Sequence, residues 1–508
     1  MKLTIEHLMA RSGVKFGTSG ARGLVAQMTD LVCYAYTRGF IQYLESCGEL
    51  KKQRETVAVA GDLRPSTSRI MEAVLRAAED AGYTPVNCGE IPSPAVAYYG
   101  LRRGVPAVMV TGSHIPADRN GIKFNKCSGE VLKDDEAGIT GQAVEVDDAL
   151  FDASGAFREP AVRPRPMQAE AENAYLARYL DFFPADALNG LRLGIYEHSA
   201  VGRDLLAKIF GRLGAKLWAL HRSDEFVPVD TEAIRDKDAR LARDWAKEFQ
   251  FDAIVSTDGD SDRPLLADEH GEWLRGDILG ILAAKFVGAD SVSTPVSSNT
   301  AVERCGFFKQ VLRTRIGSPY VIASMLEETA RGAKCVVGYE ANGGFLLGSA
   351  VTWPDSGAPL LPLPTRDAVL PILACLVEAR RQGKTLSTLV GSLPRRFTAS
   401  GLLRGFPVEQ SRAVIGLFEA GHERAAARHF GAKFGEVASL DLTDGTRITF
   451  ASGDIVHLRP SGNAPEFRCY TEAASPEQAK EHNETALHIV RSSLLTEARS
   501  SASHKPKP

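Results

Sequence analysis

The sequence has few of the features that mark secreted, zinc-binding or nucleic-acid-binding proteins. Its 508 residues include only 8 cysteines, scattered without a C-x-x-C pair, so neither a disulfide framework nor a zinc site is expected. Lys plus Arg number 60 and Asp plus Glu 63, for a net charge of −3, and like charges form no long block. We therefore expect no nucleic-acid partner and reduced thiols in an intracellular chain.

Long apolar runs are missing too. The longest, Ala368 to Val377, contains Pro371 and is followed by Glu378, and it is far shorter than the about 20 residues that a bilayer requires. The N-terminus (MKLTIEHLMARSG) has Glu6 and His7 where a signal peptide would have an apolar core. These features predict no membrane partner and a cytoplasmic location. No pattern indicates an oligomeric state, which we leave as unknown.

What the chain does have is the composition of a globular protein, with 44% hydrophobic and 24% charged residues. At about 150 residues per domain, three to four domains are expected. A strand-like run at Thr56 to Ala60 precedes a helical pattern from Ser68 to Asp80, and further strands are expected at 105–111, 191–196, 251–257 and 333–339. This alternation predicts α/β domains with mixed, mainly parallel sheets.

Two changes of composition divide the chain. The Pro- and Arg-rich stretch from Asp152 to Ala171 resembles a linker, and a second change falls near Gly391 to Pro394. Beyond it we expect an α+β domain, with a helix at 408–430, strands at 447–450 and 455–458, and a helix from Pro476. The predicted domains are 1–155, 172–295, 296–392 and 397–498, followed by a disordered tail at 499–508.

A serine and a histidine stand side by side at a predicted strand end, in the segment VTGSHIP from Val110. Ile115 excludes a G-x-S-x-G nucleophile elbow. Because Ser113 and His114 are neighbours, they are not expected to form a nucleophile–base dyad, and ordinary turn chemistry is the alternative. Downstream, an Asn-Gly turn precedes a strand that presents Lys123, a candidate general base or counter-charge for a phosphate.

Three aspartates occupy alternate positions directly after the strand at 251–257: Asp258, Asp260 and Asp262. Such oxygen ligands suit Mg²⁺ or Ca²⁺. An EF-hand would need Gly where Arg263 stands and a helix before the loop, and a chance acidic turn is the other alternative. We favour a Mg²⁺ site, with Arg263 placed to hold a phosphate.

Two further loops carry polar groups. The segment GYEANGG from Gly338 offers Glu340 and Asn342 to sugar hydroxyls, although a plain Gly-rich turn is the alternative. The segment RPSGNAPEFR has the parts of a phosphate cradle without a Walker A pattern: Arg459, Ser461, Asn463 and Arg468. Together, the four features predict phosphoryl transfer on a phosphorylated polyol.

In order and spacing these motifs, with KFGTSGARG from Lys15 and GDLRPS from Gly61, resemble the α-D-phosphohexomutase family over nearly the whole chain. The resemblance implies three similar α/β domains and a smaller C-terminal α+β domain around a central cleft. It implies an enzyme, an isomerase that interconverts hexose 6-phosphate and hexose 1-phosphate. The reaction would pass through a phosphoserine enzyme and a hexose 1,6-bisphosphate, with Mg²⁺ as cofactor and the bisphosphate as activator.

The resemblance also implies roles for single residues. Ser113 would be the phosphoserine, and its phosphate would complete a Mg²⁺ site made of Asp258, Asp260 and Asp262. The other catalytic residues, at the transferring phosphate, would be Arg22, Lys123 and His114. Glu340 and Asn342 would bind the sugar, and the remaining assignments are phosphate-binding: Arg263, Arg459, Ser461, Asn463 and Arg468.

The sequence departs from the commonest family pattern at four positions, namely Gly112, Ile115, Ser261 and Asn342. None of them removes a catalytic group, but they weaken a fine assignment of substrate. The RPSGNAPE loop and the length favour mannose phosphates. Glucose phosphates or both sugars are the alternative, followed by glucosamine phosphate, against which Ser19 counts. A non-catalytic sugar-phosphate sensor and a metal-dependent phosphatase also stay open.

Overall fold

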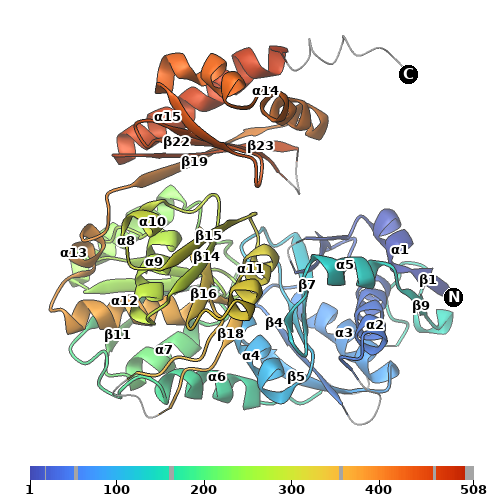
Figure 1. Ribbon diagram of the computed structural model, residues 1–508. Helices are drawn as coiled ribbons and strands as arrows, with labels where there is room; N and C mark the ends of the chain where they lie inside the picture. The colour runs from blue at the N-terminus through green and yellow to red at the C-terminus, as the bar shows by residue number, and fades with distance from the viewer. Residues whose placement is uncertain (18, 51–54, 160–164, 354–357, 462–464, 498–508) are drawn as a thin grey trace, which may run out of the picture. The chain divides into compact units, whose positions relative to one another are not determined.

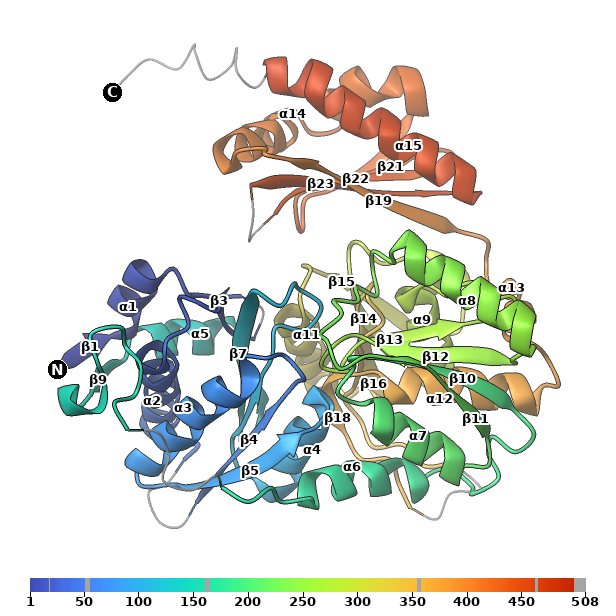
Figure 2. The same ribbon diagram turned by 180° about the vertical axis from the view of Figure 1, so that it is seen from behind.

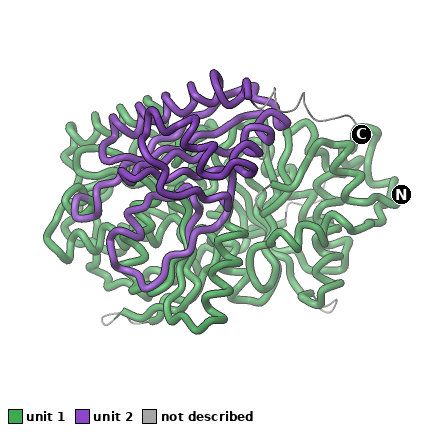
Figure 3. Tube along the Cα trace, turned by 45° about the horizontal axis from the view of Figure 1, so that its top comes forward, with its two compact units in different colours: residues 1–293, 317–390 green, residues 294–316, 391–508 purple. Residues whose placement is uncertain are grey.

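The computed structural model describes residues 1–17, 19–50, 55–159, 165–353, 358–461 and 465–497 (Figure 1). The chain divides into two compact units, one of residues 1–293 and 317–390 and one of residues 294–316 and 391–508 (Figure 3). Within the described residues, no helix combines the length and the apolar character needed to cross a membrane. The tail predicted at 499–508 lies outside the described residues.

The first sheet has the order β2-β3-β7-β6-β4-β5, with β8 beside β7. Its strands are β2 (Lys15–Phe16), β3 (Gly20–Leu24), β4 (Thr56–Gly61), β5 (Thr84–Glu90), β6 (Ala107–Val110), β7 (Arg119–Lys126) and β8 (Gly129–Glu130). The accompanying helices are α1 (Ile5–Ser12), α2 (Asp30–Ser46), α3 (Thr67–Asp80), α4 (Ser93–Arg103) and α5 (Lys133–Thr140). The helix predicted at 68–80 is α3, whose apolar face buries Ile70, Val74 and Leu75 and which packs against α2 (Figure 1).

The second sheet has the order β11-β10-β12-β13, and α7 and α8 lie on its opposite faces (Figure 2). Its strands are β10 (Arg192–His198), β11 (Lys216–Arg222), β12 (Ala253–Thr257) and β13 (Pro264–Ala267). The helices of this region are α6 (Glu170–Leu180), α7 (Arg203–Arg212) and α8 (Asp236–Phe249). In the described residues between Asp152 and α6 there is no helix or strand apart from a bridge at Phe157, and the end of the predicted linker, Ala171, lies in the first turn of α6.

The part of the third sheet in the first unit has the order β14-β16-β17-β18. Its strands are β14 (Ser291–Pro295), β16 (Val336–Tyr339), β17 (Phe345–Leu347) and β18 (Leu363–Asp367). The helices here are α9 (Gly276–Phe286), α11 (Ser318–Ala330), α12 (Val369–Arg381) and α13 (Leu386–Gly391). The longest apolar run forms α12, a core helix that packs against α9 and holds Pro371 in its first turn, where proline is tolerated.

All three sheets are mixed, and one arrangement recurs in them. Parallel pairs (β4–β6, β10–β12, β14–β16) are each followed by an antiparallel hairpin (β6–β7, β12–β13, β16–β17). The prediction of mixed, mainly parallel sheets holds for the second sheet, whereas antiparallel pairs predominate in the first, because strands joined by a short loop without a crossover helix must pair antiparallel. Each hairpin loop carries one of the predicted motifs, so the recurrence is structural although it is not visible in residue identities.

The second unit contains an antiparallel sheet of order β19-β23-β22-β21-β20, which confirms the α+β prediction. Its strands are β19 (Phe397–Arg404), β20 (Val437–Asp441), β21 (Thr446–Phe450), β22 (Ile455–Pro460) and β23 (Glu466–Ala473). The helix predicted at 408–430 is α14 (Val408–Phe434), which is longer than expected and kinked at His422, where φ is 45°. The helix expected from Pro476 is α15 (Pro476–Ile489). The shorter elements of the chain are β1 (Lys2–Thr4), β9 (Ala143–Glu145), α10 (Ala301–Arg304) and β15 (Gln310–Thr314).

Candidate active site

The serine motif lies in the loop between β6 and β7, and its backbone is held in an unusual conformation. Ser113 has a φ of 56°, a left-handed value that non-glycine residues rarely adopt. The Arg64 guanidinium fixes this turn by donating to four carbonyls, those of Ser113 (2.8 Å), Ile115 (2.6 Å), Pro116 (2.8 Å) and Arg119 (3.0 Å). The hydroxyl of Ser113 is therefore presented by a strained but fully supported loop.

Arg64 is itself fixed, which gives the GDLRPS segment a role that the sequence pattern did not define. Asp62 accepts from Arg64 Nε (3.1 Å) and, at the same carboxylate, from the Thr111 hydroxyl (2.7 Å). A Cβ at Gly112 would lie 2.6 Å from the Arg64 guanidinium carbon. The departure at Gly112 is thus explained, since a side chain there would displace the arginine that holds the serine loop.

The three aspartates lie in the hairpin loop between β12 and β13, and they meet the serine there. The Ser113 hydroxyl donates to Asp258 Oδ2 at 2.6 Å, and one carboxylate oxygen from each of Asp258, Asp260 and Asp262 lies within 4.8 Å of the others. Strands on both sides of the loop exclude the EF-hand alternative. The residue that would supply its last ligand, Glu269, instead accepts from the backbone N–H of Ser387.

The departure at Ser261 falls in the same loop. Its φ is 57°, the region that glycine adopts without penalty. The Ser261 hydroxyl accepts from the backbone N–H of Gly202 (2.9 Å), at the start of α7, and from the Thr257 hydroxyl (2.8 Å). The side chain thus gains two hydrogen bonds that a glycine would lack.

The buried carboxylates fit a divalent cation. Lys123 Nζ donates to one oxygen of Asp260 (2.5 Å) and one of Asp262 (2.6 Å), while the Oδ1 atoms of both are buried and have no hydrogen-bond partner among the described residues. Burial, then repulsion from Asp260 and Asp262, raises the pKa of Asp258 well above its usual range. A cluster of hard oxygen ligands with unused acceptors is the donor set that Mg²⁺ prefers.

Arg22 and Lys123 approach the cluster from one face of the first sheet. The β3–β7 register pairs Gly20 with Lys123 and Arg22 with Gly121, so the side chains of Arg22 and Lys123 point to the same side. Burial, then the charge of Arg263, lowers the pKa of Arg22 to about 10. The Arg22 guanidinium makes no hydrogen bond to a described residue and is available to an anion.

His114 is oriented by Arg263 rather than by its neighbour Ser113. Arg263 Nη1 lies 3.0 Å from His114 Nδ1, and since a guanidinium only donates, Nδ1 accepts and the ring proton is on Nε2. Burial, then the charges of Arg263 and Arg22, lowers the pKa of His114 well below 6.5. The Ser113 hydroxyl is 3.3 Å from the same Nδ1 but donates to Asp258, so the expectation that the two neighbours form no dyad agrees with the geometry.

The sugar-loop candidates lie between β16 and β17, also in the first unit. Glu340 is buried and accepts from Arg366 Nη1 at 3.1 Å. Asn342 Oδ1 accepts from the backbone N–H of Gly344 at 3.0 Å, so this oxygen stabilises the turn and only the amide nitrogen is offered to a ligand.

Arg366, on β18, is the residue that sequence reasoning missed. It donates to Asp262 Oδ2 (3.1 Å) and to Glu340 Oε2 (3.1 Å) and thereby joins two of the predicted motifs. Although burial alone would raise it, the pKa of Asp262 is lowered by the charges of Lys123, Arg366 and Arg263. A single arginine in an apolar segment gives no sequence signal of such a contact.

The phosphate-cradle candidates belong to the second unit. The β22–β23 register pairs Arg459 with Arg468, so both side chains lie on one face of the sheet. Arg459 Nε donates to Asp444 at 2.8 Å, and the backbone N–H of Ser461 donates to Glu466 at 2.9 Å. Asn463 lies outside the described residues.

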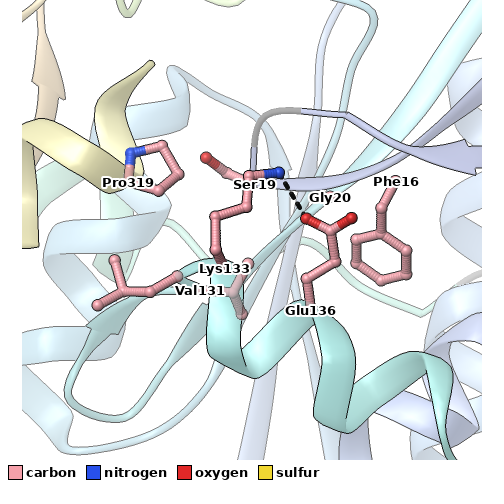
Figure 4. Close-up of a pocket in the computed structure, with 8 residues that line it drawn as sticks. Phe16, Ser19, Gly20, Val131, Lys133, Glu136 and Pro319 are labelled. Carbon is pink, nitrogen blue, oxygen red and sulfur yellow. Dashed lines mark hydrogen bonds and ion pairs between the residues drawn. The ribbon is translucent and has the colours of Figure 1, made fainter. Parts of the chain in front are cut away.

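A small hollow near Ser19 is a poorer candidate site. It is lined by Phe16, Ser19, Gly20, Val131, Leu132, Lys133, Glu136 and Pro319 (Figure 4). Lys133 and Glu136 form an ion pair across it at 2.6 Å. The hollow has essentially no room for a water-sized molecule, whereas small-molecule pockets typically enclose roughly 300–1,000 Å³.

Comparison with known families agrees with this site. Models of the phosphoglucomutase/phosphomannomutase family match in chain order: alpha/beta/alpha domain I at residues 13–149, domain II at 173–271, domain III at 275–397 and the C-terminal domain at 409–488. The first three matches include the serine, metal and sugar loops, respectively, and the fourth includes the arginine loop.

Full-length relatives agree as well. The chain is 45% identical to a phosphomannomutase of Salmonella muenchen, with 95% of this chain and 97% of the relative covered. It is 44% identical to a phosphomannomutase of Sinorhizobium fredii, with 95% and 100% covered. The crystal structure of a putative phosphomannomutase from Thermus thermophilus has the same fold, with a TM-score of 0.68, 20% identity and coverage of 94% and 99%. The chain therefore belongs to the phosphoglucomutase/phosphomannomutase family, the α-D-phosphohexomutases that its motifs resemble.

Proposed function

We propose that the chain is a phosphohexomutase that interconverts mannose 6-phosphate and mannose 1-phosphate. The observation that carries the proposal is the 2.6 Å hydrogen bond from Ser113 to Asp258, because it sets a hydroxyl that can carry a phosphoryl group at the edge of the candidate cation site. The mannose assignment is supported by the two relatives of 45% and 44% identity, both named phosphomannomutase.

The proposed reaction begins with phosphorylated Ser113. The bond from phosphorus to Oγ breaks, a bond to the free hydroxyl of a hexose monophosphate forms, and the proton lost by that hydroxyl is balanced by the one that Oγ regains. The hexose 1,6-bisphosphate then turns over, and its other phosphate returns to Ser113. Lys123, Arg22 and Arg263 supply positive charge, since positioning and charge stabilisation dominate phosphoryl transfer.

Asp258, Asp260 and Asp262 would hold Mg²⁺, which when bound supplies neutralisation of charge on the transferring phosphoryl group. Lys123 keeps Asp260 and Asp262 in place through the oxygens that it contacts. His114, kept neutral and oriented by Arg263, offers its Nε2 proton as a hydrogen-bond donor. Neither Lys123 nor His114 needs to change its protonation state near neutral pH.

The substrate must bind in two orientations, so we propose separate sites for the sugar and for the phosphate that does not react. Glu340 and Asn342 would bind ring hydroxyls. Arg459, Ser461, Asn463 and Arg468 would hold the distal phosphate, because guanidinium groups bind phosphate with two parallel hydrogen bonds.

A turnover assay tests the proposal. Enzyme, Mg²⁺ and a trace of hexose 1,6-bisphosphate are supplied with mannose, glucose or glucosamine 1-phosphate, and the 6-phosphate is measured. Preference for mannose is the expected result, and comparable rates with glucose would indicate a dual-specificity mutase. Release of free phosphate without bisphosphate would instead indicate a phosphatase, and binding without turnover a sensor. The cytoplasmic location belongs to the same proposal, and cell fractionation tests it.

A further inference from the structure

Arg366 enters the site because of an irregularity in the third sheet. In the β17–β18 pair Phe345 faces Asp367 and Leu347 faces Leu363, so β18 has two residues more than a regular antiparallel register allows. Such bulges re-aim side chains. β18 is the edge strand of the third sheet; Figures 1 and 2 both place it beside α11, and it contacts β8 of the first sheet.

The arginine is anchored from its backbone side. The next residue, Asp367, accepts from the hydroxyls of Tyr175 (2.6 Å) and Tyr179, both fully buried on α6. The preceding residue, Thr365, donates to Glu130 on β8 at 2.9 Å. The backbone at position 366 is therefore fixed on both sides, and only the side chain points toward the motifs.

The Arg366 side chain joins two loops that are distant in sequence. Nε donates to Asp262 Oδ2 at 3.1 Å, in the metal loop, and Nη1 donates to Glu340 Oε2 at 3.1 Å, in the sugar loop. Nη1 also lies 3.2 Å from the Ser318 hydroxyl. A guanidinium donates several hydrogen bonds in one rigid plane, so it fixes the angle between the two carboxylates, which an ammonium group cannot do.

The sugar loop is built to let this side chain pass. A Cβ at Gly344 would lie 2.6 Å from both Cγ and Cδ of Arg366, far inside normal contact distance. Position 344 has no positive φ, so its backbone does not require glycine. The absent side chain is explained by the arginine stem that occupies its space.

The contact with Asp262 also selects which carboxylate oxygen is free. Lys123 and Arg366 both donate to Oδ2, and the buried Oδ1 has no hydrogen-bond partner among the described residues. Arg263 Nε lies 3.6 Å from Oδ1, too far for a hydrogen bond, so the lone pairs of this oxygen are left for a cation. Outer contacts of this kind typically contribute about 10- to 100-fold to metal affinity.

We propose that Arg366 is a positioning residue that couples the cation site to the sugar site. By holding Asp262 and Glu340 in one plane, it sets the hydroxyl-binding carboxylate at a fixed distance from the phosphoryl-transfer centre. The inference rests on the proposed mutase function and adds a residue outside every motif identified from the sequence.

Three substitutions test the proposal. Arg366→Met removes the donors, Arg366→Lys keeps the charge but not the plane, and Gly344→Ala keeps the arginine but displaces its stem. Arg103→Met on α4, which breaks an exposed ion pair with Glu170, is the matched control. Thermal unfolding of each variant identifies any that fail to fold. Gly344→Ala and Arg366→Lys both keep a positive charge at position 366, so they do not leave a buried carboxylate of either loop without a counter-charge.

Two readouts separate positioning from general stability. Calorimetric titration with MgCl₂, which needs no turnover, is expected to show about 10-fold weaker binding in Arg366→Met and in Gly344→Ala. Mutase kcat/KM is expected to fall about 100-fold in Arg366→Met, with little rescue by lysine. Combining Arg366→Met with Glu340→Gln is expected to cost less than the sum of the single changes, because one contact is lost twice.

The inference would be overturned if the folded Arg366 variants bound Mg²⁺ and turned over like Arg103→Met, or if the loss with Glu340→Gln were additive. That failure is distinct from failure of the proposed function, in which the unmodified chain would not turn over any hexose phosphate. Weaker Mg²⁺ binding in Arg366→Met would still support the cation half of the coupling in that case.

Discussion

The two sets of charged residues assigned to phosphate chemistry differ in burial. In the first unit the side chains of Asp260, Asp262 and Arg366 are 0%, 3% and 4% exposed. In the second unit Arg468 is 40% exposed and lies 3.6 Å from a carboxylate oxygen of Glu466, and Arg459 is 19% exposed and paired with Asp444. The first set is buried and largely neutralised by protein groups before any substrate binds, whereas the second is more exposed to solvent.

This difference separates two tasks. Buried ion pairs are costly to break, and removing one partner leaves an unpaired charge in a medium of low dielectric constant. They therefore hold geometry, as transfer of a phosphoryl group requires. Exposed arginines hold little geometry but can release and rebind a phosphate while the sugar turns over. Substitutions in the two sets should accordingly alter different kinetic constants.

The largest effect is expected from Ser113→Ala, which removes the proposed phosphoryl carrier. Turnover should fall by at least about 10³-fold while the unfolding temperature changes little, because the loop is held by Arg64 through backbone carbonyls. Mass spectrometry of the unmodified enzyme incubated with hexose 1,6-bisphosphate should find one phosphoserine, at position 113. Ser154→Ala, at an exposed serine, is the control. Near-normal turnover of Ser113→Ala would remove the carrier assignment.

Asp260→Asn should come next, with a loss of about 10²- to 10³-fold in kcat, because it removes a cation ligand and the partner of buried Lys123. KM for the sugar phosphate should change far less than kcat. Titration with MgCl₂ shows whether the loss follows cation binding. If kcat fell but the affinity for Mg²⁺ were unchanged, Asp260 would not be a ligand.

One stability prediction applies to both units, since each has a buried histidine under its functional loop. His198 Nε2 donates to the Thr257 carbonyl (2.8 Å), beside the metal loop, and His457 Nε2 to the Asp444 carbonyl (2.6 Å), beside Arg459. Burial lowers the pKa of both to about 4. Between pH 6.5 and 4 the unfolded chain binds more protons than the folded chain. The stability that these histidines contribute is therefore full above pH 6.5 and decreases as the pH is lowered toward 4.

The expected loss is about 3 kcal/mol for each histidine at pH 4, from 1.36 kcal/mol per pKa unit. Urea unfolding at several pH values measures it. His198→Gln and His457→Gln should each remove part of the pH dependence, the first from the unfolding of the first unit and the second from that of the second. An unchanged pH profile in either variant would mean that its imidazole titrates normally.

The sequence was sufficient for whatever depends on local pattern. The strand ahead of Asp258, the helix α3 and the positions of the serine, metal and sugar segments at strand ends are confirmed, because hydrophobic periodicity and turn residues act over a few positions. In the first sheet the share of parallel pairs was overestimated, since the pattern of a strand does not reveal whether the next one returns by a hairpin. The sequence also did not predict which atoms face the substrate. Asn342 has a suitable side chain, but its oxygen accepts a hydrogen bond from the backbone N–H of Gly344.

Long-range contacts set the limit for the site. Two arginines hold the motifs together through long-range contacts. Arg366 is 104 residues from its partner Asp262, and Arg64 is 49 residues from its partner Ser113. Both are single arginines whose partners are defined only by the fold. The glycines at 112 and 344 mark the space that the two arginines occupy, because the three atoms nearest to an added Cβ all belong to Arg64 at the first position and to Arg366 at the second.

The smallest kinetic effect is expected from Arg468→Ala, and it distinguishes the two charge sets most directly. A lost charged hydrogen bond costs about 1.5–3 kcal/mol, so KM should rise roughly 10- to 100-fold while kcat stays within a few-fold. Because the side chain is exposed, KM of the unmodified enzyme should also rise with added salt, and this salt dependence should weaken in Arg468→Ala. Arg459→Ala should be worse, since it also leaves Asp444 without its 2.8 Å partner. An Arg468→Ala enzyme with unchanged KM would place the phosphate site elsewhere, and one with reduced kcat and unchanged KM would mean that the exposed set also holds transfer geometry.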